Sequence, residues 1–448
     1  MLKTTRERLT RRGGRRQGHF WPMAQSQRSL FAPEISIVST LEFAHLRQIG
    51  NPPAWIGTTQ RSSALIASRN AIMPLYIRAP YPFYKERVMK EIFTLKSRLQ
   101  WRVASALLRS VGLPVGHGWE KTVAKFPELN KKIEKDLNDA CRNHILCGDK
   151  SVRAYRLKHR EYSSIIAKAN MFLDKSSLLT KSYPYSLGEE DLNDVEINAP
   201  EFVFVNEDSE VVHLVLASHK AVRVRETMDR EILAEALGQR SLALAEKVMS
   251  SHEVISVRIE QRHAYDIICI HKERAIAEVR IDIFGNSNPS LKVPEIEEAH
   301  RSILNKFNDI EEYYLTNQIN LYPAINGLLH LNEDQEDRRA RVTRFGYLGP
   351  TGICREERKL HGDVRSDPTH LAALDAHKDD SAPVTPYDIE VQFPGSVLVS
   401  QPYIALALHG TETLARSEKP DLGEMTVTKC LYETDFRAVT AEVYNRLK

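Results

Sequence analysis

The chain has 448 residues, of which 42% are hydrophobic and 27% charged, and its formal net charge is +3. This composition is ordinary for globular proteins and argues against wholesale disorder, while the length favours two or three domains. The near-neutral total hides an asymmetry: the first 180 residues carry 32 Lys and Arg against 13 Asp and Glu, whereas the other 268 carry 30 against 46. Such asymmetry bears on binding partners more than on fold.

Five cysteines are spread along the chain, and no two of them form a CxxC pair. An odd number without zinc-type spacing argues against a disulfide framework or a zinc module and favours a reducing compartment. The sequence has no apolar run of roughly 18 residues and no apolar segment after its first positive charges, so neither a membrane span nor a secretory signal is expected. We therefore expect a soluble, cytoplasmic protein that has no membrane partner.

Residues 1–32 form a basic tail that we expect to be disordered, because seven Lys and Arg crowd its first 16 residues with a single acid. Three interpretations remain open for this tail: a phosphate-binding arm, an organelle-targeting peptide, or a leader that is never made because translation starts at Met23. Without residues 1–22 the basic excess of the first 180 residues falls from 19 to 13 charges, so the asymmetry remains.

A basic helical domain is expected over residues 33–180. Its first part, 33–84, holds six prolines and is expected to wrap over a neighbouring unit in short strands and turns. The best helix follows from Tyr84 to Val111, where apolar residues recur every three or four positions on one stripe. Basic residues occupy its other faces, and further Lys- and Arg-rich helices are expected over 127–145 and 152–173.

Residues 181–200 are interpreted as an acidic linker, because several acids and no Lys or Arg occur between 182 and 200. The rest of the chain, 201–448, is expected to be an α+β domain. It begins with strand-like segments over 201–205 and 211–217 and a helix over 225–250. Three strands then follow so closely that they must pair as antiparallel neighbours, and these are 254–261, 265–271 and 275–284.

The last part of the chain is expected to return to helix over 295–330. It ends with strands over 342–348, 388–393 and 403–409 and a terminal helix over 434–447, interrupted by a long polar loop over 349–383. The expected fold class is therefore α+β, with a helical N-terminal domain followed by a mixed domain that has an antiparallel sheet and flanking helices.

The three closely spaced strands carry the first candidate site. Asp266 lies in the middle strand, and Glu278, Arg280 and Asp282 alternate with apolar residues in the third, so the last three share one face. An aspartate in one strand, followed after a hairpin by Glu-x-Lys, resembles the core of restriction-endonuclease-like nucleases. That resemblance implies catalytic roles for Asp266, Glu278 and Arg280, with Mg²⁺ held by Asp266 and Glu278.

The nuclease pattern departs from its family in one position. Arg280 stands where those nucleases have lysine, and an arginine stays protonated, so it cannot take a proton from water. The alternative is a solvated sheet face with cross-strand ion pairs, and the alternation of charged and apolar residues favours it.

A second candidate is the long polar loop, whose imidazoles and carboxylates are the ligand types for Zn²⁺ or Mn²⁺. Its residues are His361, Asp363, Asp367, His370, Asp375, His377, Asp379 and Asp380. Their spacing matches no ligand pattern of a helix or a strand, so a flexible polar loop is the favoured interpretation.

Two groups of basic residues are candidates for nucleic-acid binding. The first lies on the outer faces of the helix over 84–111, and the second interleaves with aromatic residues that can stack on bases. Together the groups comprise Arg87, Lys90, Lys96, Arg98, Arg102, Arg338, Arg339, Arg341 and Arg344. The alternative for the second group is an exposed strand whose arginine stems cover a sheet.

Signatures of nucleotide-binding proteins, serine hydrolases and metalloproteases are missing, since the sequence holds no GxxxxGK[ST], GxSxG or HExxH. The expected function is binding of DNA or RNA through the basic N-terminal helices. One alternative is the metal-dependent nuclease, the only case that needs Mg²⁺. The other is a non-catalytic protein–protein adaptor, in which oppositely charged parts attract each other within the chain or between copies.

Overall fold

The computed structural model describes residues 84–126, 131–158, 162–197, 199–227, 255–283, 294–312, 314–331, 340–359, 361–375, 384–396 and 403–447. The chain divides into two compact units, and all these residues belong to the second, Ile66–Lys448. The expected basic tail, the proline-rich segment and most of the expected helix over 225–250 lie outside the described residues. Among the helices in the described ranges, none has both the length and the apolar character that crossing a bilayer requires.

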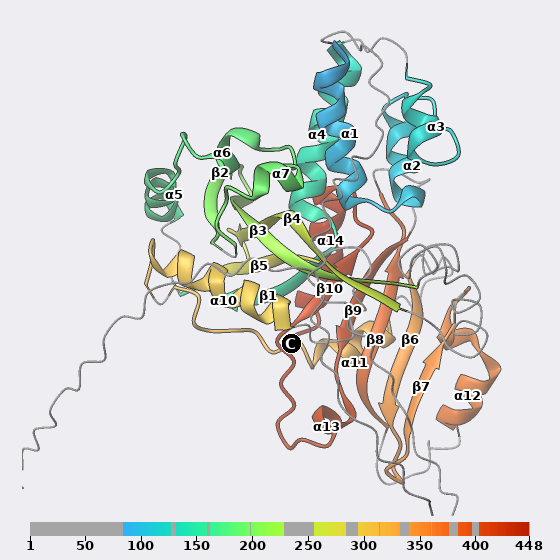
Figure 1. The fold of residues 1–448 in the computed structure, drawn as a ribbon. Coiled ribbons are helices and arrows are strands. Elements are labelled where there is room, and N and C mark those ends of the chain that lie inside the picture. Colours follow the sequence, from blue (N-terminus) through green and yellow to red (C-terminus); the bar gives the residue numbers. More distant parts are fainter. Residues whose placement is uncertain are drawn as a thin grey trace, which may run out of the picture. The chain divides into compact units, whose positions relative to one another are not determined.

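A ten-stranded sheet runs through the described structure, and all its neighbouring strands are antiparallel (Figure 1). Its first five strands, in spatial order, are β2 (Glu201–Glu207), β3 (Val211–Thr227), β4 (Ile255–His271), β5 (Ile276–Asp282) and β1 (Lys150–Arg156). The order continues with β10 (Met425–Thr428), β9 (Ile404–His409), β8 (Thr385–Phe393), β6 (Arg341–Leu348) and β7 (Cys354–Arg358). The expected mixed α+β class with an antiparallel sheet is thus confirmed.

Strand β1 corrects the prediction of a helix over 152–173. It pairs with β5 along its whole length and with β10 at its beginning, so it is a central strand. Both faces of a central strand are covered, and for this reason β1 lacks the apolar–polar alternation that marks a half-exposed strand. The helix that follows, α5 (Tyr162–Met171), begins ten residues later than predicted.

Strand β4 merges two of the three closely spaced strands that the sequence predicts. The residues between them, 262–264, keep their pairing with β3 at 218–220, so the ladder continues from Ile255 to His271 without a turn. The two strands β3 and β4 form a long ribbon, and β5 follows β4 through the predicted hairpin.

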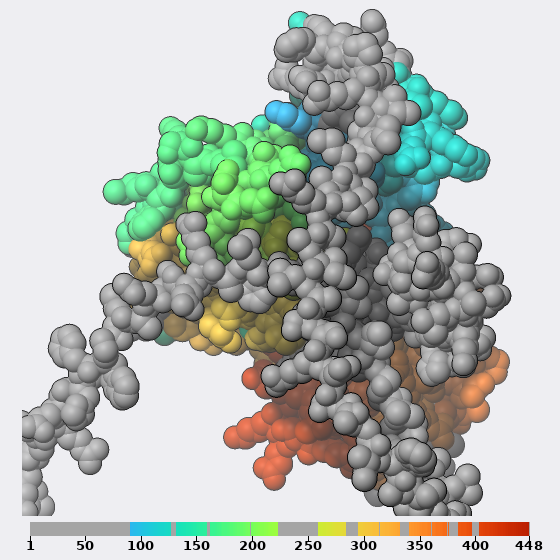
Figure 2. Space-filling model, viewed as in Figure 1, coloured from blue at the N-terminus to red at the C-terminus, as the bar shows by residue number. Residues whose placement is uncertain are grey.

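The predicted helix over 84–111 is two helices, α1 (Tyr84–Arg98) and α2 (Trp101–Ser110). Gln100 has extended backbone angles, which end the first helix and begin the second. Both pack with α3 (Trp119–Val123) and α4 (Lys131–Cys147) around a shared apolar cluster, and their outer surface is blue and cyan in Figure 2. The cluster includes Ile92, Leu95, Leu99, Val103, Leu107, Leu137 and Cys141.

The remaining helices line the sheet and its loops. The predicted helix over 295–330 is divided into α10 (Pro294–Asn308) and α11 (Ala324–Leu329), and the predicted terminal helix is confirmed as α14 (Glu433–Tyr444). The predicted linker contains α7 (Glu189–Leu192), which follows α6 (Leu178–Ser182). The long polar loop contains β7, a short 3₁₀ helix at Val364–Ser366 and α12 (Pro368–Asp375), and α13 (Glu412–Ala415) follows β9.

The strands β3, β4 and β5 have two different buried faces, and this division determines where the polar residues lie. One face packs against α4 and α6 and carries Val215, Tyr265, Ile267 and Cys269. The opposite face packs against α5 and α10 and carries Leu214, Leu216, Ile268, Ile270 and Val279. Successive residues of a strand alternate between these faces, so a polar residue on either one is buried unless it lies near an edge.

Candidate functional site

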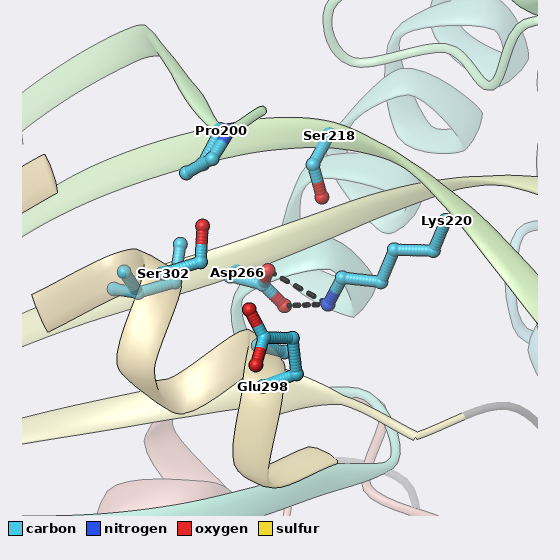
Figure 3. A pocket seen from close by; sticks show the side chains of 8 residues that line it. Pro200, Ser218, Lys220, Asp266, Glu298 and Ser302 are labelled. Atoms are coloured by element: carbon cyan, nitrogen blue, oxygen red, sulfur yellow. Dashed lines mark hydrogen bonds and ion pairs between the residues drawn. The ribbon is translucent and has the colours of Figure 1, made fainter. Parts of the chain in front are cut away.

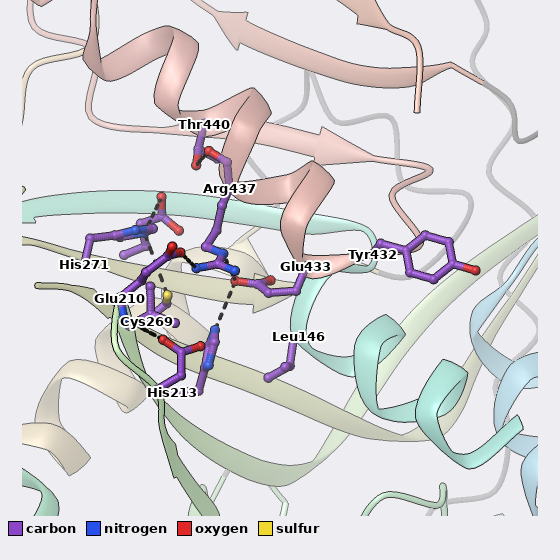
Figure 4. Close-up of polar contacts among 12 residues, drawn as sticks. Leu146, Glu210, His213, Cys269, His271, Tyr432, Glu433, Arg437 and Thr440 are labelled. Carbon is purple, nitrogen blue, oxygen red and sulfur yellow. Dashed lines mark hydrogen bonds and ion pairs between the residues drawn. The ribbon is translucent and has the colours of Figure 1, made fainter. Parts of the chain in front are cut away.

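Among the described residues, a dense group of ionisable side chains lies on the face of the sheet that also packs against α4. His213 of β3 is directly opposite Cys269 of β4, and Cys269 is opposite Glu278 of β5, so the three share one face. Further members lie two positions along the strands or come from α14 (Figure 4). We call this group the thiol–imidazole cluster: His213, Cys269, His271, Glu278, Arg280 and Glu433.

Each histidine of the cluster has its own carboxylate. His213 Nε2 lies 3.0 Å from Glu433 Oε1, and His271 Nε2 lies 3.1 Å from Glu278 Oε1. Cys269 lies beside both rings, and its Sγ is 3.7 Å from His271 Nε2. The cluster therefore holds two imidazole–carboxylate pairs with a thiol that contacts both.

Arg280 links the two carboxylates. Its Nε donates to Glu278 Oε2 at 2.7 Å and its Nη1 donates to Glu433 Oε2 at 2.8 Å, while the guanidinium lies 4.2 Å from the centre of the Phe436 ring. Tyr444 of α14 donates its hydroxyl to Glu278 Oε1 at 2.7 Å. A buried charge is tolerated only when it is paired and hydrogen-bonded, and these contacts meet that requirement.

Electrostatics shift the ionisation of this cluster. Burial by itself would raise the pKa of the Cys269 thiol, but the Arg280 guanidinium and the two imidazoles outweigh it and lower this pKa to about 6. Burial would lower the pKa of His271, yet Glu278 and Cys269 raise it to about 10. A thiolate is the form of cysteine that acts as a nucleophile or a metal ligand, and these neighbours favour that form at Cys269.

The sequence correctly placed Glu278, Arg280 and Asp282 on one face, but the solvated sheet face is wrong. Glu278 and Arg280 are both 0% exposed, because α14 covers this part of the sheet. Their ion pair also runs along one strand, from residue 278 to residue 280, rather than across two strands.

The structure does not bring Asp266 together with Glu278. Asp266 is opposite Leu216 of β3, whereas Glu278 is opposite Cys269, and these two positions of β4 alternate to opposite faces. The predicted Mg²⁺ pair and the predicted catalytic trio that includes Arg280 are therefore divided between two sides of the sheet. An interaction with a shared ion would require both carboxylates on the same side.

On its own face, Asp266 contributes to a small pocket between the sheet and α10 (Figure 3). Lys220 of β3 donates its Nζ to Asp266 Oδ1 at 2.8 Å, and the backbone N–H of Asp282 donates to the same oxygen at 2.9 Å. The rest of the lining is Pro200, Ser218, Glu298, Ala299, Ser302 and Ile303. Asp266 is thus an anchor for neighbouring protein groups.

A second buried charge network surrounds Asp282. Lys150 of β1, which is 0% exposed, donates to Asp282 Oδ1 and to the Tyr265 carbonyl oxygen, the latter at 2.7 Å. Arg98 at the end of α1 donates to the same carboxylate at 2.8 Å, so the predicted nucleic-acid contact at Arg98 is instead an internal ion pair. Burial would raise the pKa of Asp282, but Arg98 and Lys150 hold it well below its usual range.

The other predicted basic contacts fall into three classes. Lys90, Lys96 and Arg102 are exposed on α1 and α2. Arg344 is buried, because β6 is covered by its neighbours, and its Nε lies 2.7 Å from Asp388 Oδ2. Arg341 is exposed, and its guanidinium lies 4.8 Å from the centre of the Tyr403 ring. The side chain of Arg87 and the residues Arg338 and Arg339 lie outside the described part of the chain.

The predicted ligands of the long polar loop have separate partners. Asp363 Oδ1 accepts from Arg365 Nε at 2.9 Å, Asp367 pairs with Lys359 at 3.4 Å, and His370 pairs with Glu357 of β7. His377, Asp379 and Asp380 lie outside the described residues, and the described donor groups that are close enough to share an ion include none of the other loop candidates.

Sequence reasoning missed the central members of both buried networks: Lys150, His213, Cys269, His271 and Glu433. The Cys-x-His spacing at 269 and 271 could have been noticed, because residues two apart in a strand share a face. Glu433 comes from a helix more than 150 residues away, and nothing local connects it to the strands. A comparison with protein-family models found no match, and no curated protein matches this sequence.

Proposed function

We propose that this protein binds DNA or RNA through the outer surface of α1–α4. The observation that carries the proposal is the charge of the exposed residues in these helices and their loops. Among the described residues from 90 to 147, ten Lys and Arg are exposed, against two exposed acids, Glu120 and Asp139. We call the ten the basic helical surface: Lys90, Lys96, Arg102, Arg109, Lys121, Lys125, Lys131, Lys132, Lys135 and Arg142.

The packing of these helices explains why the positive charges are available. Their apolar stripes are buried against one another in the shared cluster, so the charged sides are left on the outside. Long cationic side chains on helices can reach successive phosphates of a nucleic acid, and each phosphate they neutralise releases condensed counterions. The internal ion pair of Arg98 leaves that residue out of the surface.

The nuclease alternative receives less support, because Asp266 and Glu278 lie on opposite faces of the sheet. The adaptor alternative predicts that oppositely charged surfaces of two copies attract each other, and the same binding experiment separates it from the proposal.

The test is fluorescence anisotropy with the full chain and a labelled oligonucleotide, in single-stranded and duplex form, over a series of salt concentrations. We expect log K to fall linearly with log salt. The triple variant Lys90→Gln, Lys96→Gln, Arg102→Gln should bind more weakly, and each phosphate contact that it loses should reduce the slope by about 0.9.

A matched control removes three exposed charges elsewhere: Lys175→Gln, Arg274→Gln, Lys419→Gln. It changes the net charge by the same amount but leaves the basic helical surface intact, so its binding should stay close to that of the unmodified chain. Equal losses in both triples, or no binding at low salt together with self-association, would contradict the proposal.

A further inference from the structure

The thiol–imidazole cluster contains three donor atoms with the spacing of a metal site. Cys269 Sγ, His271 Nε2 and a carboxylate oxygen of Glu278 all lie within 4.8 Å of one another. Tetrahedral zinc, with Zn–S near 2.3 Å and Zn–N near 2.0–2.1 Å, separates its ligand atoms by about 3.5 Å. The observed separations of 3.7 Å from Cys269 Sγ to His271 Nε2 and 3.1 Å from His271 Nε2 to Glu278 Oε1 are close to that value.

The three donors come from one hairpin, which fixes their geometry. Cys269 and His271 are two residues apart on β4, and Glu278 is directly opposite Cys269 on β5. Tyr444 and Arg280 hydrogen-bond to the Glu278 carboxylate and hold it in place, as outer partners of metal ligands do. The site is therefore preorganised by the sheet and by α14.

The types of donor atom in the cluster also suit a zinc-class ion. Sulfur, imidazole and carboxylate donors together are the ligands of zinc rather than of Mg²⁺ or Ca²⁺.

We propose that Cys269, His271 and Glu278 bind one zinc-class divalent metal ion. A second donor set, His213, Cys269 and Glu433, shares the same thiol. The first set is favoured because its donors belong to one hairpin, and because the His271 side chain is 11% exposed against 3% for His213, which gives an entering ion a path. This site is independent of the basic helical surface.

The test is titration of the full, chelator-treated chain with Co²⁺ under reducing conditions, followed by displacement with Zn²⁺. We expect one equivalent to produce a thiolate-to-cobalt charge-transfer band that Zn²⁺ abolishes. Cys269→Ser should lose the band, and Cys354→Ser, which changes a thiol on β7, should keep it. Far-UV circular dichroism checks that each variant is folded.

The two histidines provide a comparison that does not depend on the cysteine variant. His271→Gln should weaken Co²⁺ binding about ten-fold or more, and His213→Gln should weaken it much less. A missing band in the unmodified chain, a band that survives Cys269→Ser, or a larger effect of His213→Gln than of His271→Gln would overturn the assignment.

Discussion

At the scale of single residues, the described core is held by charges that compensate one another. Asp282 accepts hydrogen bonds from Lys150, Arg98 and the backbone N–H of Tyr265, and all three side chains of this ion network are almost fully buried. Replacing a complete buried network can be nearly neutral, whereas removing one partner leaves an uncompensated charge in a low dielectric. The two kinds of residue in this network should therefore differ in their sensitivity.

Asp282→Asn removes the carboxylate that is paired with two buried cations, Lys150 and Arg98. We expect a loss of about 3–5 kcal/mol in the free energy of unfolding, because both cations then lose their shared ion-pair partner in a low dielectric. The measurement is urea unfolding followed by circular dichroism. Lys150→Met is the matched comparison, and it should cost clearly less because Asp282 keeps Arg98. A Lys150→Met variant that is destabilised as much as Asp282→Asn would contradict this account.

At the scale of elements, local periodicity predicted the strands and helices whose apolar–polar pattern follows the burial of their faces. The alternation in β5 identified a shared face for Glu278 and Arg280, but alternation cannot reveal that a distant helix covers that face. The Lys- and Arg-rich pattern over 152–173 predicted a helix that included most of β1, and the sheet partners of β1 lie too far along the chain to leave a local signal. The thiol–imidazole cluster was not predicted for the same reason, since Glu433 and His213 are brought together only by tertiary packing.

Gly410 lies where strands β8 and β9 approach each other so closely that a larger side chain does not fit. Gly410 follows β9, and a Cβ added there would overlap the carbonyl oxygen of Tyr387 on β8. Gly410→Ala should therefore cost about 1–3 kcal/mol, because two paired strands must separate locally. Thermal unfolding measures the loss. Gly188→Ala, whose Cβ would meet nothing closer than 3.8 Å, should cost less than about 1 kcal/mol, and similar losses in both variants would show that the strand contact is not the cause.

At the scale of the whole molecule, three of the buried histidines in the described residues lie in different elements, have no hydrogen-bonded carboxylate and have lowered pKa values. They are His144 on α4, His263 on β4 and His300 on α10. Burial, assisted by Arg98, lowers the pKa of His144 and of His263 to about 3, and burial with Arg153 lowers the pKa of His300 well below its usual value. These imidazoles are therefore neutral in the folded protein near neutral pH.

The free energy of unfolding should consequently fall when the pH is lowered from 6.5 towards 5. The unfolded chain takes up protons on these imidazoles near pH 6.5, whereas the folded chain takes them up only well below that pH, at about pH 3 for His144 and His263. Each group therefore costs up to about 1.4 kcal/mol per pH unit below pH 6.5. Their contribution is thus complete above pH 6.5 and is lost on acidification. Asp282 and Glu278, whose pKa values are lowered in the fold, lose their contribution only below about pH 4, outside this window. Cys269, whose pKa is lowered to about 6, adds a slope of the same sign inside the window, so the contribution of a histidine is measured by comparing variants.

His263→Asn separates this effect from a general acid sensitivity. Its amide oxygen lies where the ring Nδ1 was and can accept the hydrogen bond that the Leu187 N–H donates there, but it takes up no proton in the unfolded chain. The slope of the free energy of unfolding against pH, between pH 6.5 and 5, should decrease by the contribution of one histidine. The control variant His117→Gln, at an exposed position, should leave this slope unchanged. Urea unfolding at a series of pH values measures both slopes. If the slope of the His263 variant also equals that of the unmodified chain, the buried imidazoles are not the cause of the acid sensitivity.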